Sequence, residues 1–167
     1  MIFASRIYAG FCLALAGSAF TLAVSAADAP PAKPVEKPLT PAMMPMLVTD
    51  LIVHDNLEGS GEGAKTGQAL SVHYTGWLYD ARQPDGKGKK FDSSLDRNER
   101  FPITLGVSRV IEGWTTGLEG MKAGGKRTLI IPARLGYGNA GAGGVIPPRA
   151  SLLFEIELFS ITGNPGK

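Results

Sequence analysis

The stretch from Gly106 to Gly124 constrains the fold most, because it predicts a short helix that has only glycines along one side. Its apolar residues recur at intervals of three and four positions, which is the spacing of one helix face. They are Val110, Ile111, Trp114, Leu118 and Met121. Beside this face run Gly113, Gly117 and Gly120. A glycine inside a helix costs about 1 kcal/mol relative to alanine, so we expect a packing reason: close approach of another backbone to this side.

The segments on either side of this helix predict strands, so the expected fold class is α+β. Strand-like patterns cover 48–57, 68–78, 101–105, 126–132 and 151–161. The connections 58–67, 80–90 and 133–148 are rich in turn-forming or charged residues and predict loops. The 80–90 loop carries four basic residues, which favour a solvated loop, with a partner contact as the alternative. We therefore expect an antiparallel sheet of about five strands around one short helix, within residues 47–162.

Residues 1–27 predict a secretory signal peptide, and hence a periplasmic or secreted protein. An apolar run follows Arg6 and ends at candidate cleavage sites around Ala27. An uncleaved anchor helix is the alternative, because the run is nearly long enough to span a bilayer. The only cysteine, Cys12, lies inside this run, so the mature chain is expected to contain no thiol. Residues 28–46 hold six prolines and predict an extended tether, and 163–167 form a short tail.

The sequence shows no motif for metal, nucleophilic or phosphate chemistry. The only histidines are His54 and His73, and neither has a second ligand at a metal-binding spacing. The G-x-S-x-G elbow and the G-x-x-x-x-G-K-[ST] phosphate loop are both missing from it. Asp92 and Asp96 could form an acid–base pair, but F-D-S-S-L-D-R more simply supplies turn and capping side chains. A net charge of +2 gives no reason to expect nucleic acid as a partner.

Aromatic and apolar residues are instead scattered through otherwise polar loops. The set comprises Tyr74, Phe91, Phe101, Val110, Ile111, Trp114, Tyr137, Val145, Ile146 and Phe154. With the single carboxylate of Asp92 among them, they predict a small apolar pocket that has few polar groups. The alternative is that these side chains are simply core, and composition alone does not decide between the two.

Six motifs in order resemble those of the FK506-binding proteins, the FKBP-type peptidyl-prolyl cis-trans isomerases. They are V-H-Y-T-G (72–76), F-D-S-S-x-D-R (91–97), V-I-E-G-W (110–114), G-L-E-G-M-K-x-G (117–124), G-Y-G (136–138) and I-P-P-x-A-x-L-x-F-E-I-E-L (146–158). The match is nearly continuous from about Leu51 to Ile161. It implies a twisted antiparallel sheet curled around a short helix, and an isomerase of X–Pro bonds that needs no cofactor and no metal.

The resemblance also implies roles for the pocket residues. The catalytic residues would be Tyr74, Asp92, Trp114 and Tyr137. The substrate-binding residues would be Phe91, Arg97, Phe101, Val110, Ile111, Val145, Ile146 and Phe154. In this assignment Trp114 is the floor, and the Tyr137 hydroxyl and the Ile111 backbone N–H meet a bound carbonyl. Asp92, held in part by Arg97 and Tyr74, lies beside the twisting amide, and Val145 and Ile146 close the pocket.

The implied partners are proline-containing segments of exported proteins, with an apolar residue preferred before the proline. Macrolides of the FK506 or rapamycin type are further implied ligands, although Arg109 stands where short members of the family often have an acidic residue that contacts them. The loop 139–144 also lacks the bulky or proline residues often found there. The sequence has a proline-rich tether in place of the long dimerisation helix of the infectivity-potentiator branch, so a monomer is expected. The alternatives are a chaperone module that binds proline peptides without turnover, and a purely structural domain.

Overall fold

Two long antiparallel strands form the centre of the sheet in the computed structural model, which describes residues 48–163. They are β3 (Ala69–Tyr79) and β8 (Leu152–Thr162), and they pair along almost their full length. Buried and less buried side chains alternate along β3, with Leu70, Val72 and Tyr74 on the buried face, as predicted.

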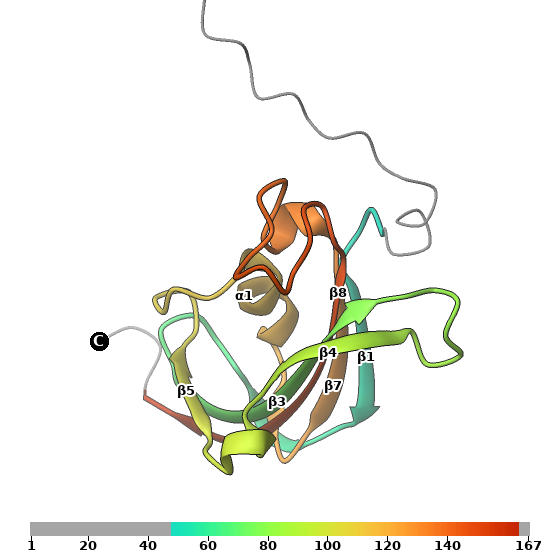
Figure 1. Ribbon diagram of the computed structural model, residues 1–167. Coiled ribbons are helices and arrows are strands. Elements are labelled where there is room, and N and C mark those ends of the chain that lie inside the picture. Colours follow the sequence, from blue (N-terminus) through green and yellow to red (C-terminus); the bar gives the residue numbers. More distant parts are fainter. Residues whose placement is uncertain (1–47, 164–167) are drawn as a thin grey trace, which may run out of the picture. The chain divides into compact units, whose positions relative to one another are not determined.

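The other strands extend the sheet on both sides of this pair (Figure 1). The order is β1–β7–β8–β3–β4, and β5 also pairs with β3. These outer strands are β1 (Ile52–Leu57), β4 (Lys87–Ser93), β5 (Phe101–Thr104) and β7 (Lys126–Ile131). Every pairing between them is antiparallel. All five predicted strands are present, and the predicted α+β fold with its antiparallel sheet is confirmed.

Three strands occur where the sequence predicts loops or helix. β4 begins inside the predicted 80–90 loop, and β2 (Ser60–Gly63) pairs with β6 (Lys122–Ala123) in a small second sheet. Their sequences are dominated by glycine, lysine and other polar residues, so no alternation of apolar and polar side chains marks them as strands. The backbone of a neighbouring strand supplies their hydrogen bonds, and the β3–β4 register is irregular at Trp77.

The helix α1 (Glu112–Leu118) is shorter than the stretch that predicted it. The chain is still extended at Ile111, which precedes the helix with ψ 147°. Beyond its end, the Gly120 N–H donates to the carbonyl of Ala64 at 2.8 Å and leads the chain into the β2–β6 sheet. The prediction that all five apolar residues share one helix face is therefore wrong for Val110, Ile111 and Met121.

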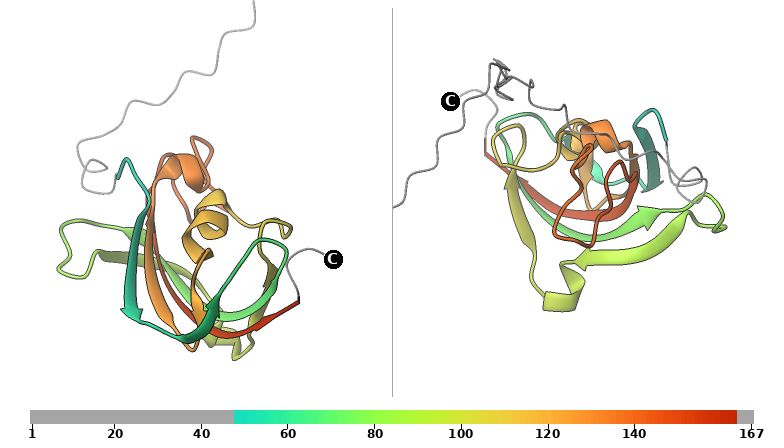
Figure 2. Two further views of the ribbon diagram at one scale, coloured as in Figure 1. Left: turned by 180° about the vertical axis from the view of Figure 1, so that it is seen from behind. Right: turned by 45° about the horizontal axis from the view of Figure 1, so that its top comes forward.

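Two glycines let α1 lie directly against β7, inside the curve of the sheet (Figure 2). A Cβ atom at Gly113 would lie 2.4 Å from Cγ2 of Ile131, and one at Gly117 would lie 2.6 Å from Cδ1 of Leu129. Close packing therefore explains these two glycines, as expected, although side chains of β7 fill the space rather than its backbone. Gly120 differs, because it lies beyond the helix at a positive φ of 74° with open space around its Cβ position.

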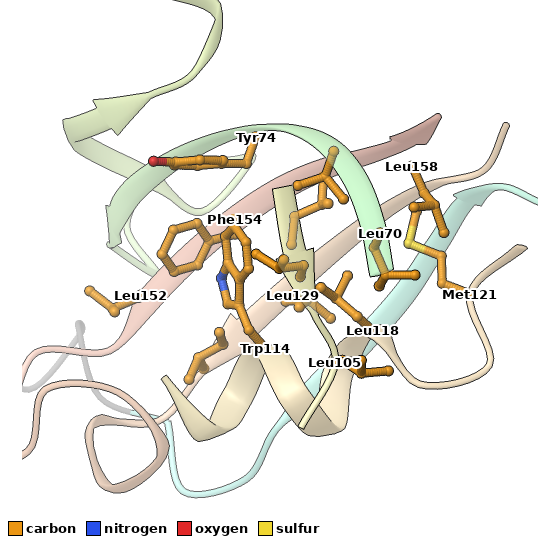
Figure 3. Packing of buried hydrophobic residues seen from close by; sticks show 14 of the residues in the cluster. Leu70, Tyr74, Leu105, Trp114, Leu118, Met121, Leu129, Leu152, Phe154 and Leu158 are labelled. Carbon is orange, nitrogen blue, oxygen red and sulfur yellow. The ribbon is translucent and has the colours of Figure 1, made fainter. Parts of the chain in front are cut away.

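The core fills the space between α1 and the concave face of the sheet (Figure 3). Trp114 and Leu118 project from α1 into it, and they meet Leu129 of β7 and Phe154 of β8. All four side chains are at most 4% exposed. Trp114 is thus part of the core, as the alternative interpretation of the sequence had it, but it also lines a cavity described below.

The predicted signal peptide (1–27), the tether (28–46) and nearly all of the predicted tail lie outside the described residues. Within residues 48–163, no helix combines the length and apolar character that crossing a membrane requires.

Replacing Gly113 with alanine should lower the free energy of unfolding by about 1–3 kcal/mol. The added methyl group overlaps the branched side chain of the buried Ile131, so the helix or this side chain must shift. Urea denaturation followed by circular dichroism measures the change. Thr116→Ala is the matched control, because Thr116 lies on the exposed side of the same helix. Equal stability of Gly113→Ala and wild type would contradict the close packing of α1 on β7.

Candidate active site

Several elements converge on one cavity of about 700 Å³ beside α1. A volume of this size lies in the range of small-ligand sites, which are mostly apolar with a few polar groups. Its lining comprises Tyr74, Phe91, Asp92, Phe101, Arg109, Val110, Ile111, Glu112, Trp114, Gly136, Tyr137 and Phe154. Nine of the predicted site residues are therefore brought together in one place. A smaller cavity of about 290 Å³ lies around His73 and Glu155 and shares only Tyr74 with this lining.

The Trp114 ring is enclosed by other aromatic rings in edge-to-face contacts (Figure 3). Ring centroids lie 5.1 Å away for Tyr74, 5.3 Å for Phe154 and 6.2 Å for Phe101. Such pairs contribute about 0.5–1.5 kcal/mol each beyond the burial of their surface. They hold the indole in one orientation, although its N–H is buried without a partner among residues 48–163.

Gly76, the last residue of V-H-Y-T-G, makes room for two rings of the cavity wall. A Cβ atom there would lie 2.7 Å from ring atoms of both Phe91 and Phe154. These rings contact each other edge to face, with centroids 5.5 Å apart. Any side chain at Gly76 would displace them, so this glycine is required by the shape of the cavity.

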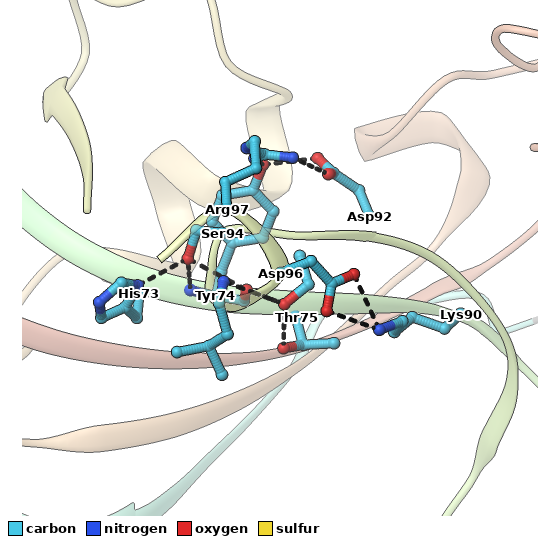
Figure 4. A network of polar contacts seen from close by, with 10 residues as sticks. His73, Tyr74, Thr75, Lys90, Asp92, Ser94, Asp96 and Arg97 are labelled. Carbon is cyan, nitrogen blue, oxygen red and sulfur yellow. Dashed lines mark hydrogen bonds and ion pairs between the residues drawn. The ribbon is translucent and has the colours of Figure 1, made fainter. Parts of the chain in front are cut away.

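Asp92 lies at the end of β4 and is held by two neighbours (Figure 4). The Tyr74 hydroxyl donates to Oδ2 of Asp92 at 2.5 Å, and Nη1 of Arg97 donates to Oδ1 at 2.8 Å. Nη2 of Arg97 also donates to the Tyr74 oxygen at 3.1 Å. The three side chains therefore form a closed triangle. Arg97, from the 3₁₀ turn η2 (Leu95–Arg97), contacts Asp92 without lining the cavity itself.

These bonds set the charge state of the cavity. Burial by itself raises the pKa of the Asp92 carboxyl group, but hydrogen bonds from Arg97 and Tyr74 outweigh it and lower the pKa below the usual 3.8. Burial, with the nearby Asp92, raises the pKa of both the Tyr74 and the Tyr137 hydroxyl. At neutral pH, Asp92 is thus ionised and paired, and both tyrosines remain protonated donors.

Two serines of F-D-S-S-L-D-R attach this segment to β3. The Tyr74 backbone N–H donates to Oγ of Ser94 at 2.9 Å, and Oγ of Ser93 lies 2.8 Å from Oγ1 of Thr75. Both serines are buried. The motif forms a turn, as predicted, but Ser94 makes no capping hydrogen bond to η2 with its side chain. Its hydrogen bond to β3 instead attaches the segment that carries Asp92 to that strand.

Asp96 does not pair with Asp92. Its carboxylate accepts from Nζ of Lys90 at 2.9 Å on the exposed surface (Figure 4). The cavity therefore contains no acid–base pair of these two aspartates.

Two of the hydrogen-bond donors at the cavity that have no acceptor among residues 48–163 are suited to a bound carbonyl group. One is the backbone N–H of Ile111, which precedes the first turn of α1 and so lies outside the bonding of the helix. The other is the hydroxyl of Tyr137, whose side chain is 40% exposed. Both can donate to a carbonyl oxygen of a bound ligand.

Two further predicted residues, Val145 and Ile146, do not line the cavity. Ile146 is 6% exposed and belongs to the core, and Val145 is 45% exposed. Their loop turns back on itself, because the backbone N–H of each residue donates to the carbonyl of Ala142. Closure of the cavity by this loop stays a prediction.

Sequence reasoning missed Glu112 and Gly136 as lining residues, and it named Arg109 only as the occupant of a family position that contacts macrolides. Only their place in the sequence could have identified them as lining residues, because each is adjacent to a predicted site residue. None is aromatic or apolar enough to stand out in a search for a hydrophobic pocket.

The cavity offers apolar walls, an ionised carboxylate paired with Arg97, and the unpartnered donors of Ile111 and Tyr137. In the part of the chain that the structure describes, no group of three or more His, Cys, Asp or Glu side chains could hold a metal ion. This arrangement can take up an apolar ring and a polar carbonyl group, and can exclude water from both. Fold and site thus define a class of small α+β domain, in which a curled sheet presents an aromatic pocket that suits a proline and its amide.

The chain belongs to the FKBP-type peptidyl-prolyl cis-trans isomerase family, whose family model matches residues 60–159. It is therefore an isomerase of the peptide bond that precedes proline. An FK506-binding protein of Neisseria meningitidis serogroup A is 55% identical over 111 residues, which are 66% of this chain and 95% of that protein. FK506-binding protein 2B of Rhizopus delemar is 58% identical over 102 residues, 61% of this chain and 45% of that protein.

A solved structure supports the fold. FkpA from Escherichia coli is 40% identical, with a TM-score of 0.58. The similarity covers 69% of this chain and 49% of the FkpA chain. This chain thus corresponds to about half of FkpA.

Replacing Tyr74 with phenylalanine should raise the pKa of Asp92, because one of the two side-chain hydrogen bonds to its ionised form is lost. A carboxyl NMR titration measures this directly, and Tyr79→Phe, outside the cavity, is the matched control. Since the folded pKa lies below the unfolded one, ionised Asp92 adds stability above the unfolded pKa, and this stability is lost as pH falls through the folded pKa. Urea midpoints taken down to acidic pH should show a smaller loss in Tyr74→Phe. An unchanged Asp92 pKa would contradict the role of the hydroxyl.

Proposed function

We propose that the cavity around Trp114 is where this chain rotates X–Pro bonds, and that its substrates are exported proteins. The observation that carries the proposal is the combination, in one cavity, of a buried aromatic wall with the unpartnered donors of Ile111 and Tyr137.

Rotation about an X–Pro bond breaks no covalent bond, so it requires no nucleophile. Its barrier of roughly 18–20 kcal/mol comes from amide resonance. Water stabilises the planar, charge-separated amide. An apolar cavity that removes this water therefore favours the twisted amide, which has lost conjugation. Each 1.36 kcal/mol by which the twisted state is bound better than the planar states accelerates rotation about tenfold.

Each kind of cavity residue has a separate role in this rotation. The proline ring stacks on Trp114 between the aromatic walls, which dehydrate the amide. The Ile111 N–H and the Tyr137 hydroxyl donate to carbonyl groups of the bound peptide and fix its main chain. Asp92, ionised but paired with Arg97, lies beside the amide as conjugation is lost.

Export is supported by the sequence of residues 1–27, whose apolar run and small-residue cleavage sites have the form of a signal peptide. We infer a periplasmic or secreted enzyme that acts on proline-containing chains folding outside the cytoplasm, and that works as a monomer.

Binding of FK506- or rapamycin-type macrolides is a further part of the proposal. It is supported by the names of the Neisseria and Rhizopus relatives, which are FK506-binding proteins, and by the aromatic cavity. The cation Arg109 at the cavity is expected to weaken this binding relative to family members that have an acidic residue there.

Isomerisation of a Leu-Pro test peptide should be fast in the wild type and at least about tenfold slower, in kcat/KM, in Trp114→Leu. Asp92→Asn should also slow it, since the paired charge beside the amide is lost. Trp77→Leu is the matched control, because Trp77 belongs to β3 but lies outside the cavity, where its ring contacts Nζ of Lys87. Circular dichroism and urea midpoints verify that each variant is folded.

Peptide binding without acceleration would contradict catalysis and favour a chaperone module. Equal rates in Trp114→Leu and Trp77→Leu would place the reaction elsewhere in the chain.

An apolar residue before the proline should be preferred, because Phe91, Phe101 and Val110 are among the apolar walls. Peptides with Leu, Ala or Glu at that position should rank in that order of kcat/KM, with Leu ahead of Glu by about tenfold for a buried side chain. Competition assays on one enzyme preparation give these ratios directly. Equal turnover of all three peptides would show that this position stays in solvent.

A further inference from the structure

Arg109 is an unengaged cation at the cavity. Among residues 48–163, no hydrogen bond, ion pair or ring contact involves its side chain, which is exposed. Other nearby cations are occupied: Arg97 binds Asp92 at 2.8 Å, and Lys90 binds Asp96 at 2.9 Å. Arg109 is therefore the lining cation whose guanidinium remains available to a ligand.

The backbone that carries Arg109 is held in a hydrogen-bonded turn between β5 and α1. The Val107 and Ser108 N–H groups both donate to the Thr104 carbonyl, at 3.0 and 2.8 Å. The Thr104 N–H donates back to Oγ of Ser108 at 2.8 Å, and the Val110 N–H donates to the Ser108 carbonyl at 2.8 Å. The base of the Arg109 side chain is thus fixed, while its end can follow a ligand.

Arg109 also lies close to the proposed anchor of the substrate main chain. It is two positions before Ile111, so the two Cα atoms are separated by at most about 7 Å. A peptide advances by about 3.4 Å per residue when extended, so a side chain one or two residues from the anchored carbonyl passes within reach of the guanidinium. In the proposed binding mode, the proline and the residue before it occupy the apolar part of the cavity, which leaves Arg109 for the flanking residues.

Glu112 also lines the cavity and has no partner among the described residues. It lies three positions after Arg109, yet the two side chains do not form an ion pair. The mouth of the cavity therefore presents one cation and one anion separately, and a client charge near Arg109 is attracted or repelled according to its sign.

From this geometry we infer that Arg109 is a specificity-determining residue: it selects clients with an aspartate or glutamate at the residue before the X–Pro unit or at one of the two residues after it. The inference rests on the proposed function of the cavity. Arg109 contacts the flank of the client and not the twisting bond, so it strengthens binding of planar and twisted states alike. Its effect falls on KM and leaves kcat nearly unchanged.

The test uses the full chain and peptides with a constant Leu-Pro core. Glu, Gln or Lys is placed at the residue before Leu, or at the first or second residue after Pro. At low salt, we expect at least one position at which Glu exceeds Lys by about three- to tenfold in kcat/KM, since attraction and repulsion at an exposed site each contribute a few-fold. The ratio should fall toward one at about 0.5 M salt, where the Debye length is only a few ångströms.

Charge reversal supplies the decisive comparison. Arg109→Glu should invert the preference to Lys at the same position, and Glu112→Gln should increase the preference for Glu. Lys89→Glu is the matched control, because it makes the same change in net charge at an exposed residue of β4 outside the cavity. It should leave the ratio as in the wild type.

The outcomes separate the inference from the function on which it rests. No turnover of the Gln peptides would overturn the proposed function. Two results would overturn the role of Arg109 alone. One is turnover of these peptides with equal Glu and Lys rates at all three positions. The other is the same Glu-to-Lys ratio in Arg109→Glu as in the wild type. A shift in Lys89→Glu as large as that in Arg109→Glu would attribute the preference to net charge and also overturn it.

Discussion

The close approach of α1 to β7 is the constraint on which the rest of the site depends. Gly113 and Gly117 leave no side chain between the helix and the buried Ile131 and Leu129, so the helix axis lies close to the sheet. At this depth Trp114 reaches the rings that rise from β3 and β8. With bulkier residues on that side of α1, the indole would be moved away from its partners. The aromatic cavity is therefore a consequence of helix packing as much as of aromatic residues.

Strand β3 positions the remaining groups of the cavity wall. Its alternation directs Tyr74 into the core, where the ring contacts Trp114 and the hydroxyl holds Asp92. Two residues later, Gly76 admits the rings of Phe91 and Phe154. The same strand makes the hydrogen bonds to Ser93 and Ser94 that hold the Asp92 segment. A single regular strand thus sets the position of the aromatic wall and of the carboxylate together.

The electrostatic state of the cavity follows from this pairing. An isolated carboxylate in an apolar cavity would have a raised pKa and would retain water. Asp92 instead has a lowered pKa because Arg97 and Tyr74 bind it directly, which keeps it ionised while its charge is balanced. The remaining donors, at Ile111 and Tyr137, are left for a ligand. Such a site suits a reaction in which a bond rotates and no atom is transferred, and family membership identifies that reaction as X–Pro isomerisation.

The sequence by itself determined the features that depend on local pattern. Alternation along β3 and β8, the paired glycines of α1 and the ordered motifs were enough to predict the α+β fold, the family and nine of the cavity residues. Only the tertiary structure decided what depends on a neighbour. β4 and the β2–β6 sheet form because an adjacent backbone accepts their hydrogen bonds, and their own side chains carry no strand pattern. Val145 and Ile146 are kept out of the lining by the fold of their own loop, whereas Arg109 and Glu112 are brought into it by the turn before α1. These placements arise from contacts between segments distant in the chain or from turn geometry, and neither leaves a periodic signal in the residues themselves.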